Sequence, residues 1–140
     1  HLCGEQPQNS DKAAEAAANS GKKVLILTDK TLDDSKAPIP SLLSTGAIHH
    51  YLVKLNLRTK IGIIVQAGDV RETHHYATLI GYGASGVHPY LALHSIVHLH
   101  QEGKLDAELS LEDALANYQK AIGYGLLKIL SKMGISTLQS

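Results

Sequence analysis

Five side chains that could bind a ligand or transfer protons stand close together in the middle of the sequence: Asp69, Arg71, Glu72, His74 and His75. An arginine can hold a carboxylate through two parallel hydrogen bonds, and histidine exchanges protons near neutral pH. The group could therefore bind a small carboxylate, with His74 or His75 as a general acid or base. The alternative is structural, because ion-pair clusters and acidic groups at a helix start often serve the fold alone.

The segments around this cluster predict a β-α-β unit. Residues 61–65 form a short apolar run rich in β-branched side chains, which predicts a strand buried on both faces. Residues 72–82 predict a helix that ends near Gly83, and residues 86–88 predict the next strand. We expect one of the two adjacent histidines to be buried between this helix and the sheet.

Polar residues follow each strand of this unit at the point where the strand gives way to a loop. Open parallel sheets bind ligands at that edge, so these positions are candidates for contact with a ligand. The residues are Gln66, Asp69, Arg71 and His88.

Histidines later in the chain could bind a metal ion. His94 and His98 are four residues apart on a predicted helix and so share a face, and His88 or His100 could complete a zinc site. The H-E-x-x-H pattern is absent, and exposed helix histidines are common. We therefore expect no native metal site.

Two further features resemble functional motifs only in part. Gly81, Gly83 and Gly86 follow a predicted helix, whereas a phosphate-binding glycine loop follows a strand and opens a helix, so we expect no nucleotide site. Cys3 is the single cysteine, so it cannot form an internal disulfide, which is compatible with a reducing compartment.

The composition excludes several classes of protein. Thirteen basic residues balance thirteen acidic ones, so no net charge attracts nucleic acid or a membrane surface. We find no apolar run near the roughly 20 residues that span a bilayer. The 140 residues, 44% of them hydrophobic, suffice for one domain with its own core.

The first half of the chain predicts two helices around a strand. Residues 1–10 are polar and lack periodicity, which favours a disordered leader or the edge of a fragment, and residues 11–19 predict an alanine-rich helix. Residues 23–28 predict the first strand, with Asp29 in the following turn. Residues 40–57 carry an apolar stripe at helical spacing.

The second half predicts helices and a last strand. Residues 89–102 should form a helix whose core face holds Leu91, Leu93, Ile96, Val97 and Leu99. A long helical region, residues 110–133, should begin at a capping box from Ser110 and end at Gly134. It should be divided or kinked at Gly123 and Gly125, and residues 135–139 should begin a fourth strand. This order predicts an α/β fold with a mostly parallel sheet of about four strands and crossover helices, part of a larger domain.

Residues 11–140 also resemble a known family. The carrying motifs are HH-Y-L-x5-R-T-K from His49, G-D-V-R-E-x-H-H-Y-A-x-L-I-G-Y-G-A from Gly68, P-Y-L-A from Pro89, and G-L-L-K-I-L-S-K-M-G-I-S-T-L-Q-S from Gly125. In this order they resemble the C-terminal part of the central domain of the glutamate synthase large subunit. The sequence departs from the family pattern at Gln66-Ala67-Gly68, where Glu-Ser-Gly is more usual, and at His88, which replaces an asparagine.

The resemblance implies a role between catalytic modules. Glutamate synthases convert glutamine and 2-oxoglutarate into two glutamates; an amidotransferase domain releases ammonia and an FMN domain uses it. The resemblance implies that this central-domain fragment is a scaffold and part of the ammonia channel, inactive alone, with no catalytic, cofactor or metal residue of its own. The residues expected to face a ligand or the channel are Asp69, Arg71, Glu72, His74 and His75. FMN and an iron–sulfur cluster are expected elsewhere in the parent enzyme. The resemblance implies that the enzyme is located in the cytoplasm, or in a plastid if it comes from a photosynthetic eukaryote.

The amidotransferases of this family use an N-terminal cysteine nucleophile. Cys3 is not the first residue and no amidotransferase sequence follows it, so we expect an incidental thiol. Two alternatives to the scaffold remain open. One is a stand-alone α/β domain that binds a small carboxylate or acts as an enzyme through the cluster at Asp69 and Arg71, and the other is a module that self-associates through an exposed apolar face.

Overall fold

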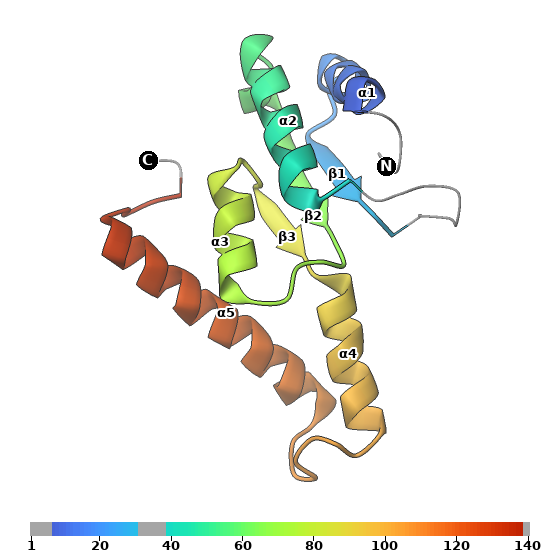
Figure 1. Ribbon diagram of the computed structural model, residues 1–140, viewed down its shortest axis with the longest axis vertical. Coiled ribbons are helices and arrows are strands. Elements are labelled where there is room, and N and C mark those ends of the chain that lie inside the picture. Colours follow the sequence, from blue (N-terminus) through green and yellow to red (C-terminus); the bar gives the residue numbers. More distant parts are fainter. Residues whose placement is uncertain (1–6, 31–38, 139–140) are drawn as a thin grey trace.

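Three parallel strands lie side by side in the order in which they occur along the chain (Figure 1). The computed structural model describes residues 7–30 and 39–138. Strand β1 (Val24–Thr28) pairs with β2 (Gly62–Gln66), which pairs with β3 (Gly86–His88). The α/β fold with a parallel sheet is therefore as the sequence predicts, although the described residues form three strands and not four.

The register of the sheet aligns the carboxyl ends of its strands. Thr28 is opposite Gln66, and Gln66 is opposite His88. Because side chains alternate across a strand, these three residues lie on the same face of the sheet. The last residues of all three strands thus form one row.

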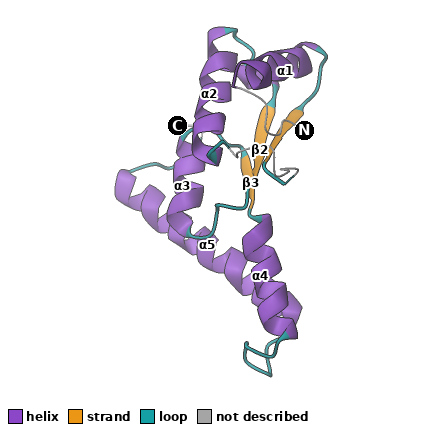
Figure 2. Cartoon of the chain, turned by 45° about the vertical axis from the view of Figure 1, so that its right-hand side comes forward, coloured by secondary structure: helices purple, strands orange, loops and turns teal. Residues whose placement is uncertain are grey.

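The helices cover one face of the sheet (Figure 2). Helix α2 (Ser41–Lys54) connects β1 to β2, and α3 (Thr73–Gly81) connects β2 to β3. Beneath them the strand residues Leu25, Leu27, Ile63 and Val65 are buried, whereas Val24 and Ile26 on the other face are 54% and 38% exposed. The expectation that the central strand is buried on both faces is wrong, because Ile64 on the open face is only half-buried.

A core between these helices and the sheet holds the fold together. Burial of such aliphatic side chains stabilises a fold by roughly 1.5–3 kcal/mol for each large residue. The core consists of Ala14, Ala18, Leu25, Leu27, Ile48, Leu52, Leu57, Ile61, Ile63, Val65, Ala67, Val70, Tyr76, Leu79 and Ala84.

Helix α1 (Pro7–Asn19) packs on α2 and begins four residues before the expected helix start. Residues 7–10 are therefore helical, and the remaining residues of the expected leader, with Cys3, lie outside the described part of the chain. A 3-10 helix, η1 (Arg58–Lys60), precedes β2.

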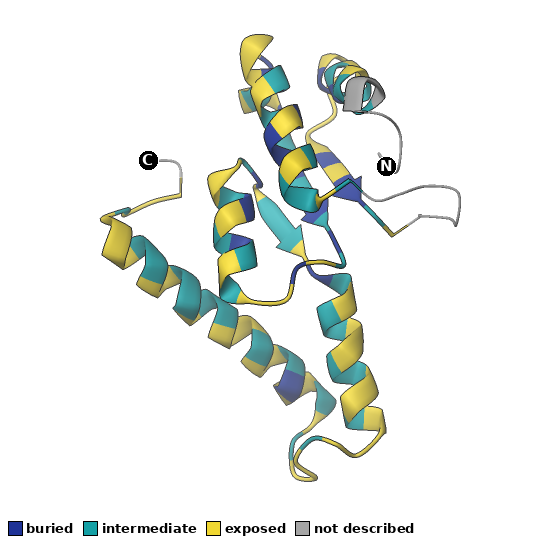
Figure 3. Ribbon diagram, in the orientation of Figure 1, coloured by how far each residue is buried: buried dark blue, intermediate teal, exposed yellow. Residues whose placement is uncertain are grey.

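Two helices follow β3 and extend beyond the carboxyl ends of the strands (Figure 1). Helix α4 (Tyr90–Gln101) leads away from the sheet, and α5 (Leu111–Met133) returns to pack against α3. The expected core face of α4 is wrong: none of its residues is buried, and Leu91 is 49% exposed (Figure 3). Among the described elements α4 packs broadly on α5 alone, so its apolar side chains have no second described layer to contact.

Helix α5 runs unbroken through Gly123 and Gly125, which corrects the expected division. Gly134 ends it in the left-handed region, at a φ of 69°, as the sequence predicts. The fourth strand is absent, since residues 135–138 form turns and bends and residues 139–140 are outside the described part. A strand needs a neighbour to accept its backbone hydrogen bonds, and this segment pairs with none of the described strands.

Candidate functional site

The five residues of the predicted cluster lie in the loop from β2 to α3 and in the first turn of α3, but they do not form one site. Asp69 binds the start of α2: its two carboxylate oxygens accept hydrogen bonds from the Ser41 hydroxyl at 2.9 and 3.0 Å. The Ser41 backbone N–H also points to Asp69 Oδ2 at 3.4 Å. Asp69 therefore fastens this loop to the first turn of α2, where a negative charge is favourable.

Arg71 is held through its backbone. Its N–H donates to His75 Nδ1 at 3.1 Å, and its carbonyl accepts from the Tyr118 hydroxyl at 2.9 Å. Its guanidinium makes no hydrogen bond or ion pair to any described residue, and the residue is exposed. The structure thus fixes the main chain of this loop and leaves the charged group in solvent.

The two adjacent histidines are both accessible. His74 is exposed, and His75 is 43% exposed with its Nε2 3.6 Å from Glu72 Oε1. The expectation that one of them is buried against the sheet is wrong. Tyr76 is the buried residue of this turn, because the periodicity of α3 directs residue 76 and not residue 75 inward.

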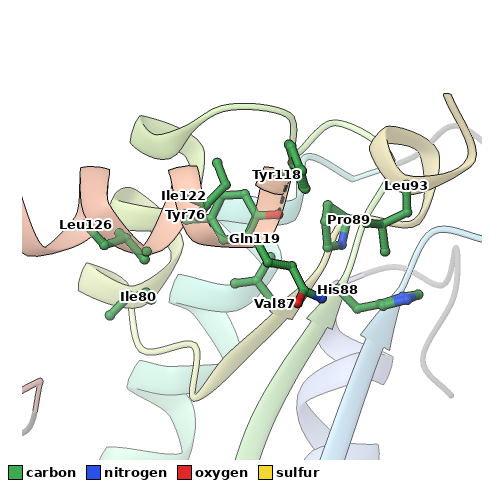
Figure 4. A pocket seen from close by; sticks show the side chains of 11 residues that line it. Tyr76, Ile80, Val87, His88, Pro89, Leu93, Tyr118, Gln119, Ile122 and Leu126 are labelled. Carbon is green, nitrogen blue, oxygen red and sulfur yellow. Dashed lines mark hydrogen bonds between the residues drawn. The ribbon is translucent and has the colours of Figure 1, made fainter. Parts of the chain in front are cut away.

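Tyr76 forms part of a mostly apolar cavity of about 350 Å³ between α3, β3, α4 and α5 (Figure 4). Its hydroxyl lies 3.2 Å from that of Tyr118, and burial followed by this hydrogen bond raises the pKa of Tyr76. The remaining walls are Ile80, Val87, His88, Pro89, Leu93, Gln119, Ile122, Gly123 and Leu126. Sequence reasoning did not find this cavity, because its walls come from residues 76–126.

The carboxyl ends of the strands carry a chain of hydrogen bonds that crosses the sheet. Thr28 Oγ1 donates to Gln66 Oε1 at 2.9 Å, and Gln66 Nε2 lies 3.1 Å from His88 Nδ1. One residue of the chain comes from each strand, at positions that the register aligns. Gln66 and His88 were among the strand-end residues that the sequence indicated, whereas Thr28 was not.

Two more residues after β1 reach the neighbouring segments. Asp29 Oδ2 accepts the Gly68 N–H at 3.0 Å, which ties the turn after β1 to the turn after β2. The other oxygen, Oδ1, is buried and has no hydrogen-bond partner among the described residues. The Lys30 ammonium lies 5.8 Å from the centre of the Tyr90 ring, just after β3.

The histidines considered as metal ligands each have a separate neighbour. His94 packs edge-on against Tyr90, His98 Nε2 lies 3.3 Å from Glu102 Oε1, and His100 Nε2 lies 3.2 Å from the Leu109 carbonyl. In the described part of the chain no three His, Cys, Asp or Glu side chains come together as metal ligands.

The glycines compared with a phosphate loop mark the end of α3 and the start of β3. Gly81 is the last residue of α3, Gly83 follows with a φ of 110°, and Gly86 opens β3.

None of the described helices is both long and apolar enough to cross a bilayer.

Solved structures share this fold over nearly the whole chain. A flavocytochrome b2 mutant with pyruvate bound matches with a TM-score of 0.70 and 19% identity, over 99% of this chain and 31% of that one. DHODH from Eimeria tenella in complex with ferulenol matches with a TM-score of 0.64 and 17% identity, over 96% of this chain and 34% of that one. At these identities the likeness concerns the fold alone.

Curated relatives are closer in sequence. The glutamate synthase [NADPH] large chain of Bacillus subtilis is 48% identical over 127 residues, which is 91% of this chain and 8% of that protein. The glutamate synthase [NADH] of Schizosaccharomyces pombe is 42% identical over 91% of this chain and 6% of its own length. A ferredoxin-dependent glutamate synthase of Pyropia yezoensis is 44% identical over 97% of this chain and 10% of its own length.

This chain therefore spans about a tenth or less of the relatives that it matches. The family described as the glutamate synthase central domain matches residues 8–140. That range includes every described strand and nearly every residue of the described helices. The chain belongs to the glutamate synthase central domain family.

Proposed function

We propose that this chain serves within a glutamate synthase as a scaffold, and as part of the channel that carries ammonia from the amidotransferase domain to the FMN domain. The observation that supports the scaffold role most strongly is the match of residues 8–140 to the central-domain family. The relatives that carry this domain are more than ten times as long as this chain. The parent enzyme converts glutamine and 2-oxoglutarate into two glutamates in this proposal, and the chemistry belongs to its other domains.

The apolar surface of the chain supports contacts with other parts of a larger protein. Val24 and Ile26 are exposed on the open face of the sheet, and Tyr124, Leu127 and Met133 on α5 are each more than 60% exposed. A soluble protein rarely leaves large apolar patches uncovered. We expect the amidotransferase and FMN domains of the same parent chain to supply that cover.

The open sheet face is also suited to a channel wall. Val24, Ile26 and Ile64 offer only hydrocarbon there, and hydrocarbon cannot donate a proton to ammonia. Ammonia would move along such a wall as the neutral molecule, which is the form that attacks an acceptor carbon.

The channel proposal is tested by Ile26→Trp in the full-length parent synthase, with Leu43→Trp on the exposed side of α2 as the matched control. We expect Ile26→Trp to keep glutamine hydrolysis while glutamate formed per glutamine consumed falls at least several-fold and free ammonia appears in the medium. Leu43→Trp should stay coupled. Unchanged coupling in Ile26→Trp, with the substitution tolerated, would remove this face from the channel.

The carboxylate-binding alternative at Asp69 and Arg71 is less well supported. Both carboxylate oxygens of Asp69 accept from Ser41, so the alternative depends on the exposed Arg71 guanidinium alone. Carboxylate binding that Arg71→Ala abolishes would restore it.

A further inference from the structure

The row of strand-end residues Thr28, Gln66 and His88 defines a second place where this chain can bind a ligand. We propose that the open face at the carboxyl ends of β1, β2 and β3 binds a small carboxylate, with the Nε2–H of His88 as hydrogen-bond donor and Lys30 as the balancing charge. This proposal goes beyond the scaffold role and does not depend on the channel.

The direction of the hydrogen bonds fixes the state of the His88 ring. The Lys30 backbone N–H donates to Thr28 Oγ1 at 3.1 Å, so the Thr28 hydroxyl hydrogen is directed onward to Gln66 Oε1. The amide oxygen of Gln66 is thereby occupied as an acceptor, and its Nε2–H is left to donate to His88 Nδ1. A neutral imidazole whose Nδ1 accepts must carry its proton on Nε2.

The Nε2–H of His88 is available for a ligand. His88 is exposed, and no described residue accepts a hydrogen bond from its Nε2. Thr28, at the other end of the chain of hydrogen bonds, is 7% exposed and anchors the row in the sheet. The row therefore holds a donor in a fixed direction before any ligand arrives, which lowers the entropy lost on binding.

Lys30 supplies a positive charge at the same edge. Its ammonium lies over the ring of Tyr90, two residues beyond His88 in the chain, and no described ion pair involves it. The neighbouring acids form no described ion pair with Lys30: one oxygen of Asp29 accepts from the Gly68 N–H, and Asp69 accepts from Ser41. A donor and a cation without a competing ion pair favour an anionic oxygen ligand, and a carboxylate satisfies both.

The fold also supports a ligand site at this edge. In parallel α/β sheets the loops at the carboxyl ends of the strands form the usual ligand site, because the side chains there come from several strands at once. Here three strands each contribute one member of the row, in register.

The test is an NMR titration of the 140-residue chain with sodium acetate and sodium succinate at constant ionic strength. We expect saturable shifts in the backbone amides of residues 28–30, 66–68, 88 and 90. At about pH 8.5, where imidazole is neutral, the imidazole ¹⁵N shifts should identify the Nε2–H form of His88. Sodium sulfate, titrated alongside, should give weaker shifts than the carboxylates.

Gln66→Glu is the decisive variant, since it keeps the size of the side chain but replaces the amide donor by an acceptor. The new carboxylate accepts a hydrogen bond only if His88 Nδ1 carries the proton. In the neutral ring Nε2 then has no hydrogen and becomes an acceptor instead of a donor. We expect the tautomer to switch and acetate to bind at least five-fold more weakly. Lys30→Met should weaken binding to a similar extent, with the tautomer unchanged.

Three control variants test whether acetate binds specifically at the strand-end row. His94→Gln removes a histidine on α4, Lys60→Met removes a lysine beyond the far ends of the strands, and Arg71→Ala removes the cation of the other candidate site. All three should bind acetate as the unaltered chain does, and far-UV circular dichroism checks that each variant folds.

Three results would overturn the proposal: an Nδ1–H tautomer in the unaltered chain, binding that survives Gln66→Glu, or no saturable shift at these amides. Shifts centred on residue 71 and lost in Arg71→Ala would assign the carboxylate to the other site. Because the titration follows carboxylate binding and not ammonia transfer, none of these results bears on the channel proposal.

Discussion

One residue, Arg58, joins three segments of the chain at the amino ends of the strands. The Arg58 side chain, which follows α2, donates to His49 Nδ1 at 3.0 Å, to the Ile61 carbonyl at 2.7 Å and to the Gly83 carbonyl at 2.6 Å. These bonds join α2, the start of β2 and the turn before β3. In sheets of parallel strands with helical connections, this end serves stability while the carboxyl end serves ligands.

Gly83 permits the close approach of this turn to α2. Its φ of 110° is a conformation that side chains disfavour, and a Cβ there would overlap the ring of His49. We expect Gly83→Ala to lower the free energy of unfolding by about 3 kcal/mol, measured by urea denaturation.

Gly103→Ala is the matched control for this prediction. Gly103 also has a positive φ, at 65°, but a Cβ there meets nothing within 4 Å. We therefore expect a loss of only about 1 kcal/mol, from the backbone conformation alone. Equal losses in the two variants would mean that the His49 contact contributes nothing.

His49 should make the chain less stable in mild acid. Burial, then the charges of Arg58 and His50, lowers the pKa of His49 below its ordinary value of 6.5. As pH falls below 6.5 the unfolded chain takes up this proton before the folded chain does, so stability present above that pH is lost.

The variant His49→Asn isolates this effect, because its amide oxygen can accept the Arg58 hydrogen bond without titrating. We expect the loss in urea midpoint between pH 7.5 and pH 5.5 to be smaller in His49→Asn than in the unaltered chain. The other eight histidines are the same in both proteins, so their contributions cancel in the comparison. Identical losses would contradict the role given to His49.

At the scale of elements, local sequence signals determine where α5 begins, and packing against α3 determines which of its glycines is required. Ser110 caps its start, with Oγ accepting the Asp113 N–H at 3.0 Å, as the sequence pattern suggests. Its two internal glycines do not break it. Gly125 packs against α3, where a Cβ would come within 2.6 Å of the Thr73 side chain, whereas a Cβ on Gly123 meets nothing within 4 Å.

The two glycines should therefore respond in opposite ways to alanine. Gly123→Ala should raise the free energy of unfolding by about 0.5–1 kcal/mol, because alanine loses less backbone entropy in a helix. Gly125→Ala should lower it, because the methyl group displaces Thr73 and loosens α3 from α5. Thermal unfolding followed by circular dichroism measures both, and stabilisation by Gly125→Ala would show that the contact with α3 is not tight.

At the scale of the whole molecule, the chain has helices on one face of its sheet and an uncovered apolar layer on the other. The outer edges of β1 and β3 also pair with no described strand. Such faces and edges promote association between copies.

We expect the 140-residue chain to self-associate weakly through this open face, at concentrations above those used in the acetate titration. Val24→Lys should reduce the association measured by analytical ultracentrifugation, because it places a charge on the face. Leu43→Lys, at a similarly exposed position on α2, should reduce it much less. A monomeric unaltered chain, or equal effects of the two changes, would contradict this prediction.

Only part of the candidate site could be predicted from the sequence. Polar residues at the ends of apolar runs indicated Gln66 and His88, but nothing in the spacing showed that Thr28 would join them. Likewise, Asp69 and Arg71 are two residues apart in the chain, yet their hydrogen bonds lead to Ser41 on α2 and to Tyr118 on α5. Those partners lie 28 and 47 residues away from them.

The sequence by itself determined the order of strands and helices, their parallel arrangement, the caps at Ser110 and Gly134, and the family. These follow from propensity, from hydrophobic periodicity and from motifs, which act over a few residues. Only the tertiary structure decided that Gly125 packs, that residues 135–138 are not a strand, and which polar side chains meet. The register of the strands and the packing of their crossover helices bring those groups together, and both arise from contacts between residues far apart in the chain.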